Sequence, residues 1–317
     1  MQLFSDLQSL RPARVGGVCM SVGVFDGVHR GHQLLLNHAA RRAGELGIKS
    51  LALTFRAHPL TLLAPPYAPR FLTTPEQKIR LIEQCGADLC MMVDFTAEFA
   101  GITAQRFLEE IVLEGCRARS ITCGPDFRFG HKGVGDVKLL RAFCGARDIE
   151  LDVLETLSDD RAPVRSTRVR QSIQDGRLDL TVRLLGRPYS VTGLVIKGDA
   201  RGQTIGFPTA NLDPPVNQLI PGDGVYAVRV VLDEEGPGGH YDGMLNIGVR
   251  PTFENKRRAI EAHLFDFQGD LYGRELTVTF ISKMREERRF ESVEALIEQL
   301  RADEAACRAL FDAPGPA

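Results

Sequence analysis

The chain of 317 residues is longer than one hydrophobic core usually serves, so we expect two domains. Hydrophobic residues make up 44% of the chain and charged residues 25%, and the formal net charge of -2 excludes a global cationic excess for wrapping nucleic acid or coating an anionic membrane. Any binding of phosphate groups must therefore be local.

The cellular compartment is suggested by three absences in the sequence. The start shows no basic segment followed by an apolar one, and no apolar stretch is long enough to span a bilayer. The seven cysteines form no CxxC or close pair and fall mostly in apolar segments, which favours buried free thiols. We therefore expect a cytoplasmic protein with neither membrane nor nucleic acid as a partner, and the sequence sets no oligomeric state.

In the first half, short apolar runs alternate with helical patterns, which is typical of βα units that stack into a parallel sheet. One expected helix ends at Gly47, and another begins at Thr74-Pro75-Glu76 and ends at Gly86. The expected strands are 18–24, 50–55, 89–93 and 120–123, with a weaker candidate at 150–154. These elements predict a Rossmann-like, doubly wound α/β fold.

After Gly186 the pattern changes to alternating strands separated by turns rich in glycine and proline, which favours a closed or nearly closed antiparallel β-barrel. The segment 234–239 is expected to be a hairpin loop. A terminal helix capped by Ser292 should pack on the barrel. The expected strands are 190–196, 225–232, 259–267 and 275–282, and the helix stripe holds Val293, Leu296, Ile297, Leu300, Cys307 and Leu310. We expect domains at 1–182 and 183–317.

The first candidate site is the segment 23–32, GVFDGVHRGH, which follows an apolar strand and leads into a helix. Its glycines permit a tight turn and a close approach of the backbone to a ligand at a helix N-terminus. His29 and His32 can both face one phosphate and stabilise its developing charge. HxxH alone is more typical of half a metal site or of a plain glycine-rich turn, but the strand-loop-helix context and the flanking FDG favour nucleotidyl transfer.

Three further segments stand after strands or in the loops that follow, where open α/β sheets bind ligands. They are TFRAHP at 54–59, GPDFRFG at 124–130 and STRVR at 166–170. Taken alone, STRVR is more typical of a helix start, and His58 or the FRFG aromatics are as often structural.

The second candidate site is the segment 198–212, GDARGQTIGFPTANL. Gly198, Gly202 and Gly206 could let a loop lie across phosphates, and extended spacing puts Thr209 and Asn211 on one side. Two neutral oxygen ligands suit a Mg²⁺ ion that arrives with ATP. Without further context, a glycine-rich barrel loop is the simpler interpretation.

The motifs in both halves resemble those of the bacterial bifunctional riboflavin kinase and FAD synthetase family. GVFDGVHRGH and its three companions are similar to the adenylyl-transfer half, and GFPTAN, GVY at 224–226, NIGVRPT at 246–252 and EAHLFD at 261–266 to the kinase half. The resemblance covers roughly residues 15–312. It implies that riboflavin and ATP give FMN, that FMN and ATP then give FAD and pyrophosphate, and that Mg²⁺ accompanies both nucleotides.

In the first domain the resemblance implies that His29 and His32 contact the phosphates of ATP. The chain departs from the family at Arg165, where a second serine usually stands. The residues implied to bind the nucleotide are Gly23, Phe25, Asp26, Gly31, Ser166, Thr167 and Arg170, and those implied to bind the flavin are His58, Pro59, Asp126 and Phe127.

In the second domain the resemblance implies that Glu261 accepts the proton of the attacking riboflavin hydroxyl. Arg285, in the segment 280–290, is implied to contact the flavin. The implied nucleotide-binding residues are Gly198, Gly202, Gly206, Thr209 and Asn211, of which Thr209 and Asn211 would also hold the metal.

Two alternatives remain at this point. The chain could be a nucleotidyltransferase of single activity with another acceptor, such as a pantetheine phosphate, although GFPTAN and Glu261 argue against it. The barrel could instead bind an oligonucleotide or a protein, which would need a basic groove with stacking aromatics. The absence of tryptophan and the acidic stretches disfavour that second alternative.

Overall fold

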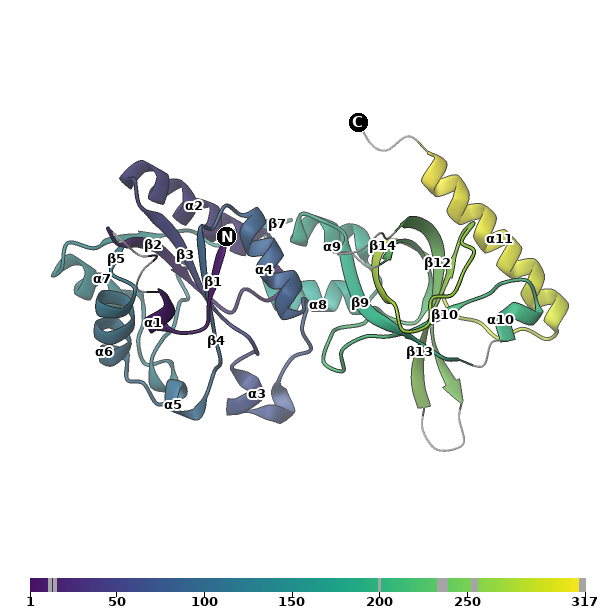
Figure 1. Ribbon diagram of the computed structural model, residues 1–317, viewed down its shortest axis with the longest axis horizontal. Helices are drawn as coiled ribbons and strands as arrows, with labels where there is room; N and C mark the ends of the chain where they lie inside the picture. Colours follow the sequence, from purple (N-terminus) through teal and green to yellow (C-terminus); the bar gives the residue numbers. More distant parts are fainter. Residues whose placement is uncertain (11–12, 14–15, 199–200, 233–238, 252–255, 314–317) are drawn as a thin grey trace. The chain divides into compact units, whose positions relative to one another are not determined.

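The computed structural model describes residues 1–10, 13, 16–198, 201–232, 239–251 and 256–313 (Figure 1). The expected loop 234–239 lies outside the described residues except for Gly239, and so does Thr252 of the NIGVRPT segment. The chain divides into two compact units, Met1–Ser166 and Thr167–Ala317. Among the described residues, no helix combines the length and apolar character needed to cross a bilayer.

The first unit contains a six-stranded sheet in the order β1-β4-β3-β2-β5-β6, and all of its strand pairs are parallel. Its strands are β1 (Gln2–Phe4), β2 (Val18–Val22), β3 (Lys49–Phe55), β4 (Leu89–Val93), β5 (Ala118–Cys123) and β6 (Glu150–Val153). The five expected strands are confirmed. β1 was not expected, because this three-residue edge strand is largely exposed and has no apolar run.

Helices cover both faces of this sheet, because successive side chains of each strand point to opposite faces. Ala52 and Met92 pack in one core with Leu36 and Ile82, whereas Leu53 belongs to the core on the other face. The helices are α1 (Leu7–Leu10), η2 (Asp26–Val28), α2 (Arg30–Leu46), α3 (Leu60–Leu63), η3 (Pro65–Tyr67), α4 (Pro75–Gln84), α5 (Ala97–Ala100), α6 (Ala104–Arg106), η4 (Phe107–Gly115), η5 (His131–Gly133) and α7 (Val137–Gly145). This is the expected doubly wound fold.

The predicted ends of the helices are also confirmed. Gly47 ends α2 in the left-handed conformation, with φ of 63°. Thr74 caps α4 and forms a reciprocal capping box with Gln77. After β6 a short hairpin follows, formed by β7 (Ser158–Asp159) and β8 (Ala162–Pro163).

The second unit contains a closed barrel with strand order β10-β13-β12-β11-β14-β9, as the alternating pattern predicted. The side chains of Tyr189, Tyr226 and Phe280 are buried, and the ring of Phe280 contacts the rings of both tyrosines. The elements are α8 (Ser166–Gln174), α9 (Leu178–Leu185), β9 (Tyr189–Ile196), α10 (Arg201–Thr204), β10 (Ala210–Asp213), β11 (Gly224–Leu232), β12 (His240–Pro251), β13 (Lys256–Leu264), β14 (Glu275–Arg285) and α11 (Val293–Asp312). The boundary between the two compact units, after Ser166, comes earlier in the chain than the expected domain boundary at 182/183. The expected boundary stays a prediction about the functional domains.

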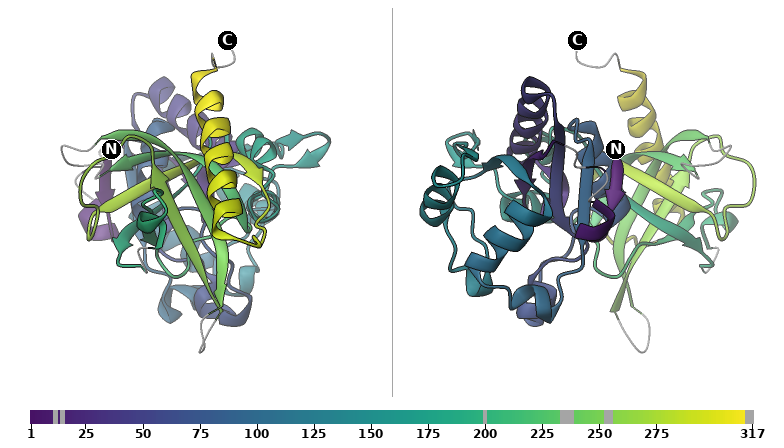
Figure 2. Two further views of the ribbon diagram at one scale, coloured as in Figure 1. Left: turned by 90° about the vertical axis from the view of Figure 1, so that its right-hand side faces the viewer. Right: turned by 60° about the vertical axis from the view of Figure 1, so that its left-hand side comes forward.

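The terminal helix α11 runs along the outside of the barrel (Figure 2). Its Cys307, Ile297 and Leu300 join a core with Ala227 and Met244 of the barrel strands. The expected packing of this helix is therefore confirmed. Two members of the predicted stripe, Val293 and Leu310, are exposed instead.

Candidate active sites

The loop after β2 has an unusual backbone. Phe25, Gly27 and Val28 all have positive φ values, of 48°, 77° and 36°. Such conformations are strained for residues other than glycine and persist only where the surroundings hold them. A Cβ atom at Gly23 would lie 2.8 Å from the ring of Phe25, so only glycine fits beneath that ring.

A buried lysine holds this loop beside the next one. The Nζ of Lys78 on α4 donates to the carbonyl oxygens of Val24 (3.2 Å) and Phe55 (2.7 Å), which lie just after β2 and at the end of β3. Burial lowers the pKa of Lys78, and the nearby Asp26 partly opposes that shift. Sequence reasoning missed Lys78, because a lysine in an amphipathic helix is normally solvated.

The carboxylate of Asp26 forms a hydrogen bond within the protein. It is buried and accepts a hydrogen bond from the backbone N–H of Leu72 at 2.9 Å. Asp26 is not among the described residues that line either cavity below. Its direct contact with a nucleotide stays a prediction.

The two histidines of the motif lie together at the start of α2. Their rings are stacked with centroids 3.6 Å apart, and Nδ1 of His29 caps the helix by accepting from the N–H of His32. Burial, followed by the proximity of His29 and Lys78, holds the pKa of His32 well below its usual value. Its buried Nδ1 has no hydrogen-bond partner within the described part of the chain. The lowered pKa favours the neutral form of His32, and its Nδ1 can form a hydrogen bond with a ligand.

Two cavities meet beside these histidines. The smaller, of about 270 Å³, is walled by the loops after β2, β5 and β6 and by residues 164–166. The larger, of about 990 Å³, is walled largely by aromatic rings, namely Phe55, Phe95, Phe99, Phe107, Phe127 and Phe129. Both cavities share Val22, Gly23, His32, Asp126, Phe127 and Ser166. A ligand that occupied both cavities would pass these shared residues.

The strand order explains why the cavities form at this place. The chain runs from β2 through β3 to β4 on one side of β2, and then returns to β5 on the other side. Ligands of open α/β sheets bind at the carboxyl ends of the strands where this reversal occurs. The loops after β2 and β5 carry the histidines and Asp126, and they are neighbours because their strands pair.

Most of the residues expected in the first site lie at these cavities. Gly23, Phe25, His29, Gly31, His32 and Ser166 line the smaller cavity, and His58, Pro59, Asp126 and Phe127 line the larger one. Thr167 and Arg170 lie on α8 beyond the division between the units, so their place at the triphosphate stays a prediction. Sequence reasoning missed Phe95 and Phe99, which come from a short loop and helix with no motif.

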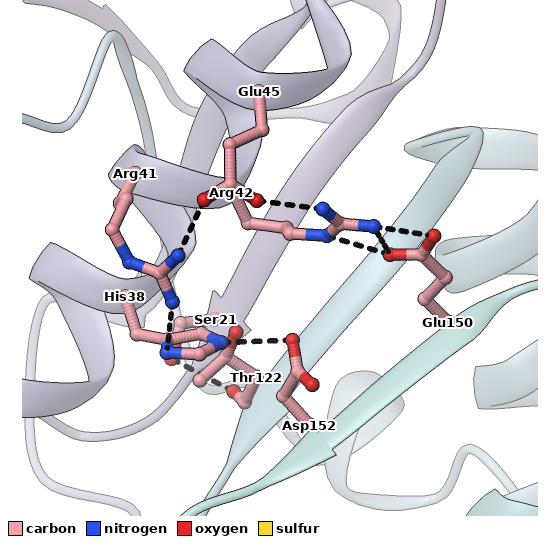
Figure 3. Close-up of polar contacts among 8 residues, drawn as sticks. All are labelled: Ser21, His38, Arg41, Arg42, Glu45, Thr122, Glu150 and Asp152. Atoms are coloured by element: carbon pink, nitrogen blue, oxygen red, sulfur yellow. Dashed lines mark hydrogen bonds and ion pairs between the residues drawn. The ribbon is translucent and has the colours of Figure 1, made fainter.

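Helix α2, which presents the histidines, is joined to β6 by a polar network (Figure 3). His38 forms a 2.8 Å contact with Asp152, and Arg42 donates to both carboxylate oxygens of Glu150 at 2.6 and 2.7 Å. Arg41 contacts the other ring nitrogen of His38. Single exposed pairs contribute little, but two pairs between the same two elements help to fix their relative position.

In the second unit, one row of residues crosses five strands of the barrel. Arg285 of β14 pairs with Val225 of β11, which pairs in turn with Asn246 of β12. Asn246 pairs with Glu261 of β13, and Glu261 pairs with Asn211 of β10. The row therefore joins three residues that the sequence proposed separately. Asn246 was part of a recognised segment but was not proposed as a site residue, and only the register reveals its place beside Glu261.

The loop before β10 folds closely around its glycines. A Cβ atom at Gly198 would lie 2.1 Å from the amide nitrogen of Asn211, and one at Gly202 would lie 2.2 Å from the carbonyl oxygen of Phe207 and 3.3 Å from Oγ1 of Thr209. Gly206 has a φ of 84°, in the region that favours glycine. The structure thus brings Gly198, Gly202, Thr209 and Asn211 together.

Arg285 is held by the terminal helix. Its guanidinium donates to both carboxylate oxygens of Asp303 on α11 at 2.7 to 3.0 Å, and Asp303 is only 5% exposed. The bidentate geometry makes this a strong pair. The contact of Arg285 with a flavin stays a prediction.

Thr209, just before β10, and Asn211, on β10, form a donor set that suits a magnesium ion that arrives with a nucleotide. Among the described residues, no group of three or more His, Cys, Asp or Glu side chains could hold a metal. Thr209 and Asn211 instead offer neutral oxygens, which leave most of an octahedral shell for water and phosphate. Glycine at 198 and 202 leaves the space beside these two side chains unfilled by a Cβ atom.

Comparison with known proteins places the chain in a family. The riboflavin kinase family model matches residues 185–311, and the FAD synthetase model matches residues 12–168. The bifunctional riboflavin kinase/FMN adenylyltransferase of Escherichia coli K12 is 37% identical over the full length of both chains. The chain belongs to the bifunctional riboflavin kinase/FMN adenylyltransferase family. It therefore carries both a riboflavin kinase and an FMN adenylyltransferase, as the motifs implied.

Further relatives agree over most of their length. The enzyme of the same name from Pseudomonas fluorescens is 39% identical over 98% of each chain, and that from Bacillus subtilis is 36% identical over 90% of this chain and 89% of its own. A solved structure named as a macrolide-efflux protein from Streptococcus pneumoniae has a TM-score of 0.85 and 31% identity, covering 96% of this chain and 98% of its own. The whole architecture of both units therefore recurs in a solved structure.

Proposed function

We propose that the family's two reactions use the two sites separately. FMN is adenylylated where the two cavities of the first unit meet, and riboflavin is phosphorylated beside the row that holds Glu261. The observation that supports the first assignment is that His32, Asp126 and Ser166 line both cavities. The aromatic cavity suits a planar flavin ring, and the smaller cavity beside the histidines suits the nucleotide.

In the adenylyl transfer, an oxygen of the FMN phosphate forms a bond to the α-phosphorus of ATP. The bond from that phosphorus to the bridging oxygen breaks, and its electron pair leaves with pyrophosphate. The FMN phosphate is already ionised near neutral pH, so the step needs orientation and charge stabilisation rather than a strong base. His29 and His32 supply hydrogen bonds to the phosphates, and the neutral state of His32 agrees with a role as donor.

In the kinase reaction, the carboxylate of Glu261 accepts the proton of the riboflavin hydroxyl as that oxygen attacks the γ-phosphorus of ATP. The bond from the γ-phosphorus to the β–γ bridging oxygen breaks, and its electron pair leaves with ADP. Gly198, Gly202 and Gly206 let the loop approach the phosphates, and Arg285 contacts the flavin. Thr209 and Asn211 hold Mg²⁺, which when bound neutralises charge on the phosphates. Asn211 pairs with Glu261 across the strands, which supports a common site for metal and base.

We also propose that the enzyme works in the cytoplasm as a small-molecule enzyme on riboflavin, FMN and ATP. All seven cysteines are free, as expected for a reducing compartment.

Incubation of the pure protein with riboflavin, ATP and MgCl₂, followed by chromatography of the flavins over time, tests this function. We expect FMN first and FAD later, and neither product when EDTA replaces magnesium. Phosphopantetheine in place of riboflavin tests the alternative acceptor. FMN that accumulates without FAD, together with adenylylated phosphopantetheine, would show that the first site serves another acceptor.

A further inference from the structure

We propose that Arg165 is a binding residue for the nucleotide polyphosphate in the smaller cavity, and that Asp126 holds its guanidinium until the nucleotide arrives. This inference rests on the proposed adenylylation site. It concerns binding, because Arg165 takes part in neither the P–O bond that forms nor the one that breaks.

The described wall of the smaller cavity holds one permanently positive side chain. Among the described residues that line this cavity, Arg165 is the one lysine or arginine. The polyphosphate of ATP carries several negative charges, and such groups are generally bound by cations or by clustered N–H donors. The neutral His32 supplies no compensating charge. Among the described lining residues, Arg165 is thus the permanently charged cation that can bind a polyphosphate.

The backbone around Arg165 is fixed on both sides. The N–H of Val164 donates to the carbonyl oxygen of Leu157 at 2.8 Å, and Oγ of Ser166 donates to the carbonyl oxygen of Asp26 at 3.2 Å. A Cβ atom at Gly31 would lie 3.5 Å from the carbonyl oxygen of Val164, so this segment lies against the start of α2. The Arg165 side chain therefore projects from a rigid position beside the histidines.

The side chain itself is free to exchange its partner at low cost. Nη2 of Arg165 lies 3.1 Å from Oδ2 of Asp126, and the two side chains are 58% and 67% exposed. Exposed ion pairs of this kind contribute little free energy. A polyphosphate offers the guanidinium more charge and a geometry that fits its fork of donors. Phosphate oxygens would therefore replace the carboxylate.

The ion pair with Arg165 also neutralises the charge of Asp126 before the nucleotide binds. Asp126 lines both cavities, whereas Arg165 lines only the smaller one. An unpaired carboxylate beside the smaller cavity would repel the phosphates of the nucleotide, and the resting pair neutralises it. Because Arg165 belongs to the nucleotide side, its loss should weaken the binding of ATP far more than that of FMN.

The test measures initial rates of FAD formation from supplied FMN by the full-length protein, with ATP and FMN varied in turn. For Arg165→Ser we expect the KM for ATP to rise about ten-fold, with the KM for FMN and kcat within about two-fold of the parent. Arg165→Lys should recover part of the affinity for ATP. Arg56→Ser is the matched control, because Arg56 forms a similar exposed pair with Asp94 at 3.2 Å and lines neither described cavity.

The double variant Asp126→Asn/Arg165→Ser separates phosphate binding from mere neutralisation of Asp126. If Arg165 binds the polyphosphate, the KM for ATP stays raised in the double variant. An unchanged KM for ATP in Arg165→Ser, or a KM restored to that of the parent in the double variant, would overturn the inference. A parent protein that forms no FAD from FMN would instead overturn the proposed function of the site.

Discussion

Asn211 and Glu261 face each other across the antiparallel pair β10 and β13. Directly opposed residues of an antiparallel pair have Cβ atoms within about 5.5 Å of each other. A proposed metal ligand and a proposed base, separated by half of the barrel sequence, are thus neighbours. The register therefore explains how one surface of the barrel could hold both Mg²⁺ with ATP and the hydroxyl to be phosphorylated.

The first prediction concerns Gly198, whose added Cβ would lie 2.1 Å from the Asn211 amide. Gly198→Ala should displace that amide and lower the initial rate of FMN formation at least about ten-fold, which is a loss of about 1.4 kcal/mol of transition-state stabilisation. FAD formation from supplied FMN should be unaffected. Gly44→Ala is the control, since its added Cβ on α2 would meet no atom within 4 Å other than those of its chain neighbours and the adjacent helix backbone. Normal FMN formation by Gly198→Ala would contradict the packing of this loop on Asn211.

The second prediction concerns the pH dependence of stability. The pKa of His32 is lowered in the folded chain, so the unfolded chain binds the proton more readily. Its contribution to stability is therefore complete above the ordinary pKa of 6.5 and is lost as the pH falls below that value.

Calorimetry of His32→Gln between pH 7.5 and 5.5 checks this effect. The stability of the first unit should fall less steeply with acid than in the parent, by up to about 1.4 kcal/mol per pH unit. His240→Gln, at an exposed position on β12, serves as control and should keep the slope of the parent. Equal slopes for the parent and His32→Gln would show that His32 does not carry the effect.

The third prediction concerns Lys78, which bonds the carbonyl oxygens of Val24 and Phe55. Lys78→Met removes the donor to the buried carbonyl oxygen of Phe55, at a cost of about 1–3 kcal/mol, and leaves the carbonyl oxygen of Val24 with Oγ1 of Thr54 (3.0 Å) as its donor. Because these carbonyls belong to two loops of the first site, the KM values for both ATP and FMN should rise in FAD formation.

Steady-state kinetics and thermal unfolding together check the role of Lys78. Riboflavin phosphorylation below the unfolding temperature should be unchanged, and Lys49→Met, at an exposed position at the start of β3, should resemble the parent. If Lys78→Met lowered the unfolding temperature but left both KM values unchanged, the lysine would stabilise the fold without positioning the site.

The sequence predicted those elements whose side chains carry a local signal. Buried apolar runs and capping residues identified the inner strands and the ends of α2 and α4. By contrast, β12 was not among the expected strands. It contains Gly243, where a Cβ would lie 2.5 Å from the carbonyl oxygen of His263. The close approach of β12 and β13 therefore requires a glycine that interrupts the alternation of apolar and polar residues in β12. The motifs contain many of the residues that line the two cavities of the first unit. Phe95, Lys78 and the Asp126–Arg165 pair depend instead on tertiary contacts without a periodic or motif signal.

The most direct test of the two separate sites is the flavin product profile of two variants, His29→Ala and Glu261→Gln, given riboflavin or FMN with ATP and MgCl₂. His29→Ala should convert riboflavin to FMN normally and form FAD at least about a hundred-fold more slowly. Glu261→Gln should lose FMN formation to a similar extent and still convert supplied FMN to FAD. Loss of both products in either folded variant would contradict the assignment of the two reactions to two sites.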